Sequence, residues 1–164
     1  MIGWLDTDRT TSTLIIGGGN WYRSDDAVGL VVARRIKAMR LFGVEVCEGS
    51  GEGSALMDAW NGAQNIIIID ASSSGLLPGT ILTLDAQAQS IPSAFLHYSS
   101  HAFGVAEAIE LARALKQLPP RLMVFGIEGK NFAAGIGLSA EVEKAVGEVV
   151  SNVIDQIQLL GADR

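Results

Sequence analysis

IIGGGNWYRSDDAVG, residues 15–29, is the stretch that decides the fold of this chain. It opens inside an apolar strand predicted over Thr13–Gly18, which three consecutive glycines end because glycine permits tight turns and close backbone approach. Ser24–Asp26 then stand where a helix favours a cap and first-turn anions, and the apolar pattern predicts a helix over Asp26–Arg40. A strand that delivers acidic residues to the mouth of a sheet is a common way to build a site in α/β proteins.

The alternation of strands and helices continues along the chain. Asn65–Asp70 contains four consecutive isoleucines, which predicts a strand buried on both faces and therefore a parallel sheet with helices on each side. The gap before Thr80–Leu84 is turn-rich and too short for a helical crossover, so we expect that strand to be antiparallel and at an edge. Further strands are predicted over Phe42–Glu48 and Arg121–Ile127, and further helices around residues 55–60, over His101–Lys116 and after Ser139.

These elements predict a single domain over residues 1–164 of the α/β class. We expect a three-layer α/β/α arrangement with a five-stranded, mostly parallel twisted sheet and one antiparallel edge strand. In the helix predicted over 101–116, the residues expected to be buried are Phe103, Val105, Ile109, Leu111 and Leu115. The last helix carries an apolar stripe of Val142, Val146, Val149, Val153, Ile157 and Leu160.

The composition excludes several classes of function. Of 164 residues, 48% are hydrophobic and 18% charged, which argues for a folded core and against disorder. The formal net charge of −6, without a cluster of Lys and Arg, argues against nucleic-acid binding. No apolar run is long enough for a membrane span, and residues 1–13 lack the apolar core of a signal peptide. With Cys47 as the only cysteine, a cytoplasmic location is the simplest expectation.

Three side chains are candidate metal ligands at the carboxyl edge of the predicted sheet. They are Asp26 after the first strand, Asp70 at the end of the isoleucine strand, and His101 at a helix start. Glu48, at the end of the second strand, is a weaker fourth candidate. Two carboxylates and one imidazole suit a divalent ion of intermediate softness such as nickel, zinc or iron.

Each candidate also has a purely structural interpretation. Asp25 and Asp26 can simply complement a helix N-terminus, and Asp70 can open an Asx turn before the serines that follow it. His101 can cap or pack against its helix. Cys47, in an alternating strand, is interpreted as a small core residue rather than a nucleophile.

Several well-known catalytic and nucleotide-binding motifs are missing. His97 and His101 are four residues apart but lack the intervening glutamate of the HExxH zinc proteases, and no G-x-S-x-G elbow is present. Gly126–Asn131 has the wrong spacing for a phosphate-binding loop. In a dinucleotide-binding fingerprint that began at Gly17, the third glycine would fall at Tyr22.

The pattern Gly17-x-Gly19-Asn20-x-x-x-x-Asp25-Asp26-x-x-Gly29 resembles the nickel–iron hydrogenase maturation proteases, the endopeptidases that trim the C-terminus of the hydrogenase large subunit. Four further blocks of this family have similar counterparts in the same order across residues 12–155. These blocks are Ile66–Ala71, Ser100-His101-x-x-Gly104, Phe125–Ile127 and Gly137–Ser139.

The resemblance implies a function and a set of site residues. It implies that Asp26, Asp70 and His101 contact metal and serve peptide hydrolysis. It also implies that the metal is the nickel of the substrate hydrogenase, which is recognised in the large-subunit precursor and is not a permanent cofactor of the protease. Trp21, Tyr22 and Arg23, beside Asp26, are candidates for contact with that protein substrate; packing over the sheet edge is their other interpretation.

The sequence departs from the family pattern at three places. Asp26 stands where some members have glutamate, Ala27 where many have glycine, and Glu128–Asn131 where others often have a loop with proline. Two competing functions remain open, and the first of them would use the same site residues. One is a docking or chaperone-like module that senses the metal of a metalloenzyme precursor without cutting it, and the other is a nucleotide-binding α/β domain that uses the glycine turn.

Overall fold

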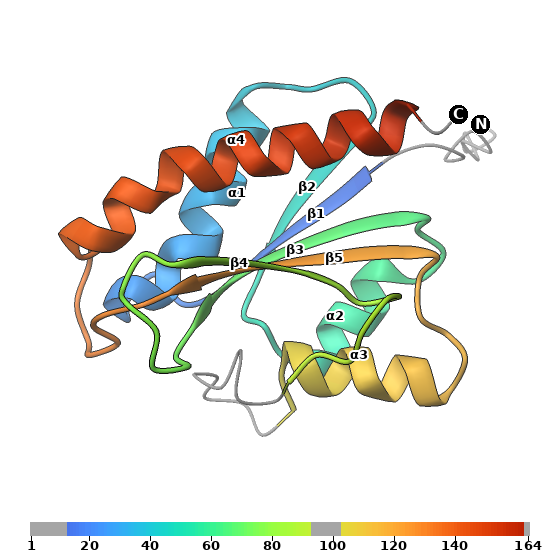
Figure 1. Cartoon of the computed structure of the whole chain (residues 1–164), viewed down its shortest axis with the longest axis horizontal. Coiled ribbons are helices and arrows are strands. Elements are labelled where there is room, and N and C mark those ends of the chain that lie inside the picture. Colours follow the sequence, from blue (N-terminus) through green and yellow to red (C-terminus); the bar gives the residue numbers. More distant parts are fainter. Residues whose placement is uncertain (1–12, 93–102, 163–164) are drawn as a thin grey trace, which may run out of the picture.

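The computed structural model describes residues 13–92 and 103–162, which form a five-stranded sheet with helices on both faces (Figure 1). The strands are ordered β2-β1-β3-β5-β4; β4 runs antiparallel to β5, and every other neighbouring pair is parallel. The predicted α/β class and the antiparallel edge strand are therefore confirmed. The elements are β1 (Thr13–Gly18), the short 3-10 helix η1 (Ser24–Ala27), α1 (Val28–Ala38), β2 (Val44–Gly49), α2 (Gly53–Trp60), β3 (Asn65–Ser72), β4 (Ile81–Asp85), α3 (Val105–Ala114), β5 (Arg121–Glu128) and α4 (Ala140–Ala162).

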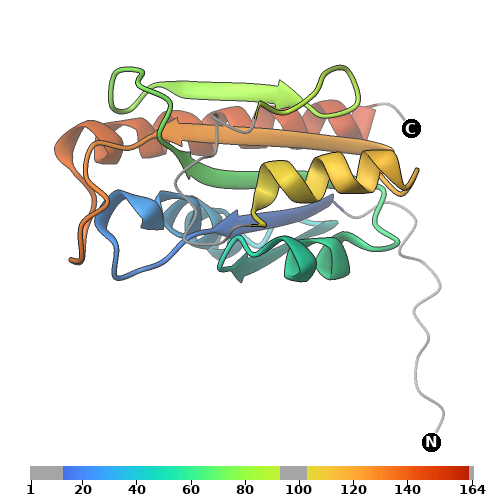
Figure 2. The ribbon, with the colours of Figure 1, turned by 90° about the horizontal axis from the view of Figure 1, so that it is seen from below.

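The isoleucine strand β3 joins the two hydrophobic layers. Side chains alternate along a strand, so Ile66 and Ile68 face the layer formed by α2 and α3, whereas Ile67 and Ile69 face α1 and α4. All four are completely buried. Seen from below, α2 and α3 lie in front of the sheet and α4 lies behind it (Figure 2). The expectation of a strand covered on both faces is confirmed.

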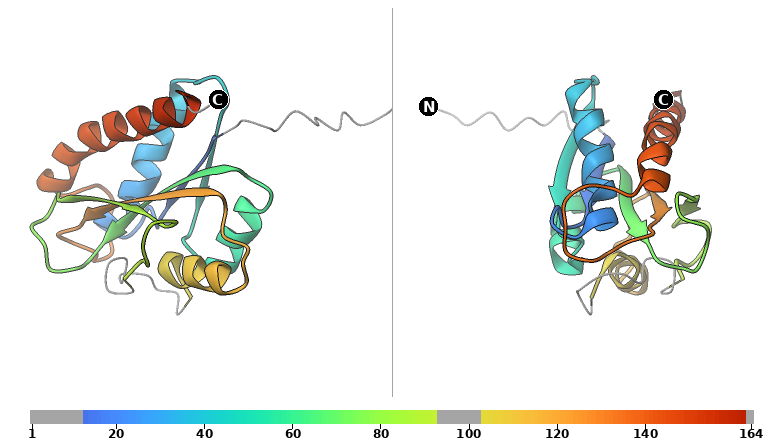
Figure 3. Two further views of the ribbon diagram at one scale, coloured as in Figure 1. Left: turned by 45° about the vertical axis from the view of Figure 1, so that its right-hand side comes forward. Right: turned by 90° about the vertical axis from the view of Figure 1, so that its left-hand side faces the viewer.

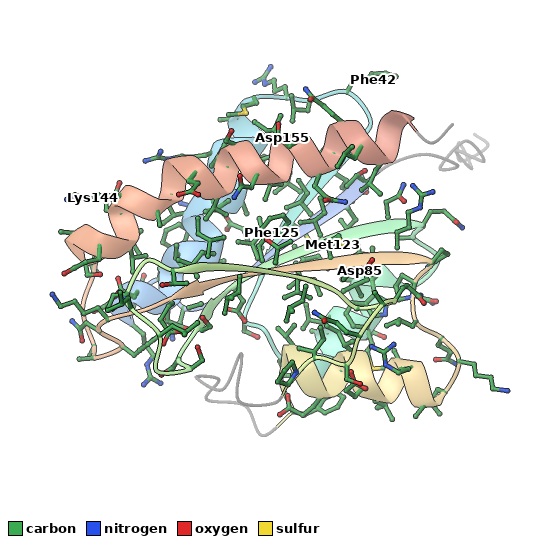
Figure 4. All side chains as sticks on the ribbon, viewed as in Figure 1. Phe42, Asp85, Met123, Phe125, Lys144 and Asp155 are labelled. Atoms are coloured by element: carbon green, nitrogen blue, oxygen red, sulfur yellow. The ribbon has the colours of Figure 1, made fainter. Side chains whose placement is uncertain are left out.

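The long helix α4 covers the sheet as its apolar stripe predicts. Val142, Val146, Val149 and Val153 are fully buried in the cluster that contains Phe125 of β5. Figure 4 shows Phe125 on the side of the sheet that α4 covers, while Lys144 and Asp155 project from the helix.

The predicted burial in α3 is partly wrong. Val105 and Ile109 are buried, but Leu111 and Leu115 are 41% and 53% exposed. The buried stripe is completed by Ala106, Ala108 and Ala112, which bring the helix close to the sheet. The positions of large apolar side chains therefore do not predict the buried face of α3, because alanines form its contact with the sheet.

The carboxyl ends of β1, β3 and β5 meet at one edge of the molecule, where three loops leave the sheet. Residues 19–27, 73–80 and 129–139 form these loops, and Figure 3 (right) views the molecule from this edge. Across residues 13–92 and 103–162, no helix has the length and apolar character that crossing a membrane requires.

Candidate active site

Glycines allow the start of α1 to pack directly on the ends of β1 and β3. A Cβ on Gly29 would overlap the carbonyl oxygen of Ile69, the residue just before Asp70. A Cβ on Gly19 would overlap the carbonyl oxygen of Asp26, and Gly19 has a φ of 142°, which side-chain-bearing residues rarely adopt. The glycine motif therefore brings the segment that carries Asp26 against the end of β3.

Asp26 and Asp70, two of the three predicted ligands, lie near each other at this edge. Asp26 lies in η1 and Asp70 near the end of β3, and both side chains are partly buried. A Cβ on Gly18 or on Gly51 would stand within 3.5 Å of the Asp70 carboxyl group. The Asp70 Oδ1 accepts a hydrogen bond of 2.8 Å from the N–H of Ala71, the next residue, whereas an Asx turn uses the N–H two residues on.

The surroundings of Asp70 favour its neutral form. Burial is the largest cause, and with the negative charge of nearby Asp26 it raises the pKa of Asp70 to about 7, against the opposing hydrogen bond from Ala71. A carboxyl group that titrates near neutral pH can exchange a proton during a reaction or release it to bind a cation. The pair therefore places the negative charge of Asp26 beside a carboxyl group that exchanges its proton near neutral pH.

Asp25, directly before Asp26, has a different role from the predicted helix cap. Its side chain is fully buried and accepts hydrogen bonds from the N–H groups of Lys130, Asn131 and Ser139 and from the Ser139 hydroxyl, at 2.7–2.9 Å. Burial raises the pKa of Asp25, but these hydrogen bonds outweigh it and hold the pKa below its usual value. Asp25 does lie in the first turn of η1, as the helix N-terminus interpretation expects, but its hydrogen-bond donors all lie at residues 130–139, before α4.

A second buried carboxylate, Glu128, was missed by the sequence reasoning. It lies at the end of β5 and accepts hydrogen bonds from both the N–H and hydroxyl of Ser74, from the hydroxyl of Ser72 and from the N–H of Gly75. It thereby fixes the loop that follows Asp70. The sequence does show a charged residue at the end of an apolar strand and a run of serines after Asp70. Nothing in it shows that Glu128 and these serines meet, because that contact depends on the register between β3 and β5.

Glu48, the weaker site candidate, forms an ion pair with α1. Arg34 contacts both of its carboxylate oxygens, at 2.7 and 3.3 Å, and the same guanidinium group lies 4.3 Å from the centre of the Trp21 ring. Trp21 is thus packed against α1, whereas Tyr22 is 69% exposed beside it. The packing of Trp21 is therefore against α1, and contact of the exposed Tyr22 with a protein substrate stays a prediction.

Cys47 has the properties of a structural residue. It is partly buried in β2 and packs against the α2–α3 side of the core. Burial, with a smaller contribution from Glu45, raises the pKa of its thiol, so the nucleophilic thiolate is disfavoured. The interpretation as a small core residue fits these surroundings.

The third predicted ligand, His101, lies outside the described residues. Within the part of the chain that the structure describes, no group of three or more His, Cys, Asp and Glu side chains is arranged to hold a metal ion. Asp26 and Asp70 bring two carboxyl groups to one place, and an ion there would need further ligands from elsewhere.

Two carboxyl groups at the carboxyl edge of a mostly parallel α/β sheet, one of them with a raised pKa, are the features of an enzyme site that handles a proton or a cation. The family model described as hydrogenase maturation protease matches residues 30–156. The chain belongs to this family and is a peptide hydrolase. The matched range includes Asp70 and begins four residues after Asp26.

Individual relatives agree with this assignment. A Methanocaldococcus jannaschii protein that carries the provisional name of hydrogenase maturation protease is 33% identical over 156 residues, covering 88% of this chain and 96% of its own. The [NiFe] hydrogenase maturation protease HybD of Thermococcus kodakarensis is similar in structure, with a TM-score of 0.70, 27% identity and coverage of 90% and 99%. The fold also matches the hydrogenase maturating endopeptidase HybD of E. coli, with a TM-score of 0.76 at 22% identity and coverage of 92% and 94%.

Proposed function

We propose that this protein removes the C-terminal extension of a [NiFe] hydrogenase large-subunit precursor after nickel insertion, and that the inserted nickel is what it recognises. The observation that carries the proposal is the Asp26–Asp70 pair at the carboxyl edge, in a member of the hydrogenase maturation protease family. The partner is thus a protein already loaded with metal. The cytoplasm, where its single cysteine remains a thiol, is the proposed place of this reaction.

Asp26, Asp70 and His101 are the proposed contacts to the nickel of the precursor. Two carboxylate oxygens and an imidazole nitrogen suit this ion, which is borderline in softness. The ion belongs to the substrate, and it polarises a bound water or the scissile carbonyl when it is present. Recognition through the ion predicts that a precursor without nickel is left uncut, because the ligands then have nothing to bind.

Asp70 is our candidate for the group that accepts a proton during hydrolysis. In the metal-free protein its pKa is about 7, so a substantial fraction of Asp70 is deprotonated at neutral pH when the precursor binds. In the proposed step, the water oxygen attacks the peptide carbonyl carbon and Asp70 takes the water proton. The peptide C–N bond then breaks, and the leaving amine receives the proton that Asp70 took from the water.

The test is a processing assay with nickel-loaded and nickel-free precursor, followed by mass spectrometry of the C-terminal peptide. We expect trimming of the loaded precursor only, and a loss of about 100-fold or more in Asp26→Asn, Asp70→Asn and His101→Ala, the range typical of lost acid–base or metal contacts. Asp155→Asn, which removes an exposed carboxylate on α4, is the matched control and should cleave normally. Equal trimming of the nickel-free precursor would overturn the recognition step, and full activity in the site variants would overturn the residue assignments.

A further inference from the structure

Two loops far apart in the sequence are joined at the carboxyl edge of the sheet. Residues 19–27 connect β1 to α1, and residues 129–139 connect β5 to α4 (Figure 1). The backbone of Gly135 accepts a hydrogen bond from the N–H of Ser24 at 3.0 Å and donates one to the carbonyl of Tyr22 at 2.9 Å. The N–H of Asp25 donates to the carbonyl of Asn131 at 2.9 Å. The two loops therefore form one connected surface beside Asp26.

The buried Asp25 side chain links the two loops through hydrogen bonds. Its Oδ2 accepts from the N–H groups of Lys130 and Asn131 and from the Ser139 hydroxyl, and its Oδ1 accepts from the Ser139 N–H. The positive charge of Lys130 is not what satisfies the carboxylate, because its ammonium group bonds Glu141 at 2.7 Å. A buried carboxylate satisfied by oriented N–H groups fixes the backbone of the donating loop, since each donor has one direction.

The other side of loop 19–27 has a second attachment. Trp21 stacks on Arg34 of α1, and Arg34 pairs with Glu48 at the end of β2. Asp26 follows Asp25 directly and lies on the same short helix, η1. Its position relative to Asp70 thus depends on a loop that is tied to α1 and β2 on one side and to the α4 loop on the other.

We infer that Asp25 is a positioning residue of the hydrolytic site: by binding loop 129–139 to η1, it fixes Asp26 beside Asp70. The inference rests on the proposed function, in which both carboxylates contact the nickel of the substrate. Metal ligands and reacting groups must be held within about 0.5 Å of their productive geometry, and small misplacements cost up to about 100-fold in rate. A carboxylate that touches no substrate can therefore control the rate through its neighbour.

The test compares Asp25→Asn with two further variants. Asn keeps the size of Asp but replaces one acceptor oxygen with an NH₂ group, which faces the N–H donors of loop 129–139. Ser139→Ala removes only the hydroxyl donor and leaves three N–H donors in place. Val153→Ala creates a cavity under α4, away from the loops, and serves as the control for lost stability alone.

The readouts are kcat and KM on nickel-loaded precursor, and the affinity of the isolated protein for nickel chloride by calorimetry, at a temperature where all variants are folded. For Asp25→Asn we expect kcat to fall about 30-fold or more with KM within about threefold, and nickel affinity to fall about tenfold. Ser139→Ala should lose about threefold in kcat. Val153→Ala should retain wild-type values of all three quantities.

Several outcomes would overturn the inference. One is a folded Asp25→Asn protein that matches Val153→Ala in kcat and in nickel affinity. Another is a rise in KM alone, which would assign Asp25 to substrate docking instead of the position of Asp26. If Asp25→Asn does not fold, Ser139→Ala decides by the same criteria.

Failure of the proposed function gives a different pattern. A wild-type protein that binds nickel chloride but cuts no precursor overturns the proposed function, and the nickel affinities of the variants still decide the role of Asp25. A wild-type protein that neither cuts nor binds nickel overturns both.

Discussion

Asp25 and Asp26 are identical neighbours whose carboxylates have opposite surroundings. Asp25 is fully buried and surrounded by N–H donors, which favour its charged form. Asp26 remains partly exposed beside Asp70, whose ionisation it opposes. A carboxylate that is already satisfied by backbone donors is a poor metal ligand, because binding a cation would break those hydrogen bonds. Of the two residues, Asp25 is therefore the less suited to bind a cation.

Replacing Asp70 with asparagine should stabilise the metal-free protein at alkaline pH. The folded-state pKa of about 7 lies above the ordinary 3.8, so the native state binds more protons between these values and stability falls as pH rises through that window. Asn has no charge to bury, so we expect Asp70→Asn to be more stable than wild type by up to about 4 kcal/mol at pH 8. Urea unfolding at pH 8 and at pH 4, where the advantage should disappear, measures this. An advantage of equal size at both pH values would contradict the raised pKa.

The charge of Asp26 should be visible in the titration of Asp70. Burial is the larger cause of the raised pKa and Asp26 the smaller, so Asp26→Asn should lower the pKa of Asp70 below 7 and leave it above 3.8. Carboxyl-carbon NMR titration of the metal-free protein reports this value directly. Asp155→Asn, on the outer side of α4, should leave it unchanged. An unchanged Asp70 pKa in Asp26→Asn would show that the two carboxylates are not coupled.

At the scale of elements, the contact between α1 and the strand ends determines the site. Gly29 touches the backbone of β3, whereas Gly147, also inside a helix, has open space where a Cβ would be. Gly29→Ala should therefore cost roughly 1–3 kcal/mol through overpacking, while Gly147→Ala should stabilise α4 by about 0.5–1 kcal/mol through higher helix propensity. Denaturant unfolding of both variants measures these two changes in the free energy of unfolding. A neutral Gly29→Ala would contradict direct packing of α1 on the strands.

The elements that the sequence predicted well are those in which local pattern and tertiary packing agree. The isoleucine run of β3 alternates between the two layers, so its burial on both faces could be read from four adjacent residues. In α3 the agreement fails, because alanines form the contact and Leu111 and Leu115 face outward. Hydrophobic size predicts burial only where a helix is not packed too closely for large side chains.

At the scale of the whole molecule, the site residues that could be predicted are those that directly follow a strand. Asp26 and Asp70 were predicted at the carboxyl edge because each follows a strand of a predicted parallel sheet, and the structure brings them together. The hydrogen bonds by which Asp25 and Glu128 hold the neighbouring loops were not predicted. The donors to Asp25 lie 105–114 residues away and are mainly backbone N–H groups, which carry no sequence signal. His101, the third predicted ligand, lies outside the described residues and stays a prediction.

Nickel chloride should stabilise the whole protein in a way that depends on pH. An ion bound between Asp26 and Asp70 must displace the Asp70 proton, so a pKa of about 7 predicts about tenfold tighter binding at pH 8 than at pH 6 from this group alone. Because a ligand that binds only the folded state raises its stability, the nickel-induced rise in Tm should be clearly larger at pH 8. Differential scanning fluorimetry at fixed nickel concentration measures both shifts. Asp70→Asn should lose most of the rise and, with no proton left to displace at position 70, should show a smaller pH dependence. A nickel-induced rise equal at both pH values in wild type would mean that the ion binds without Asp70.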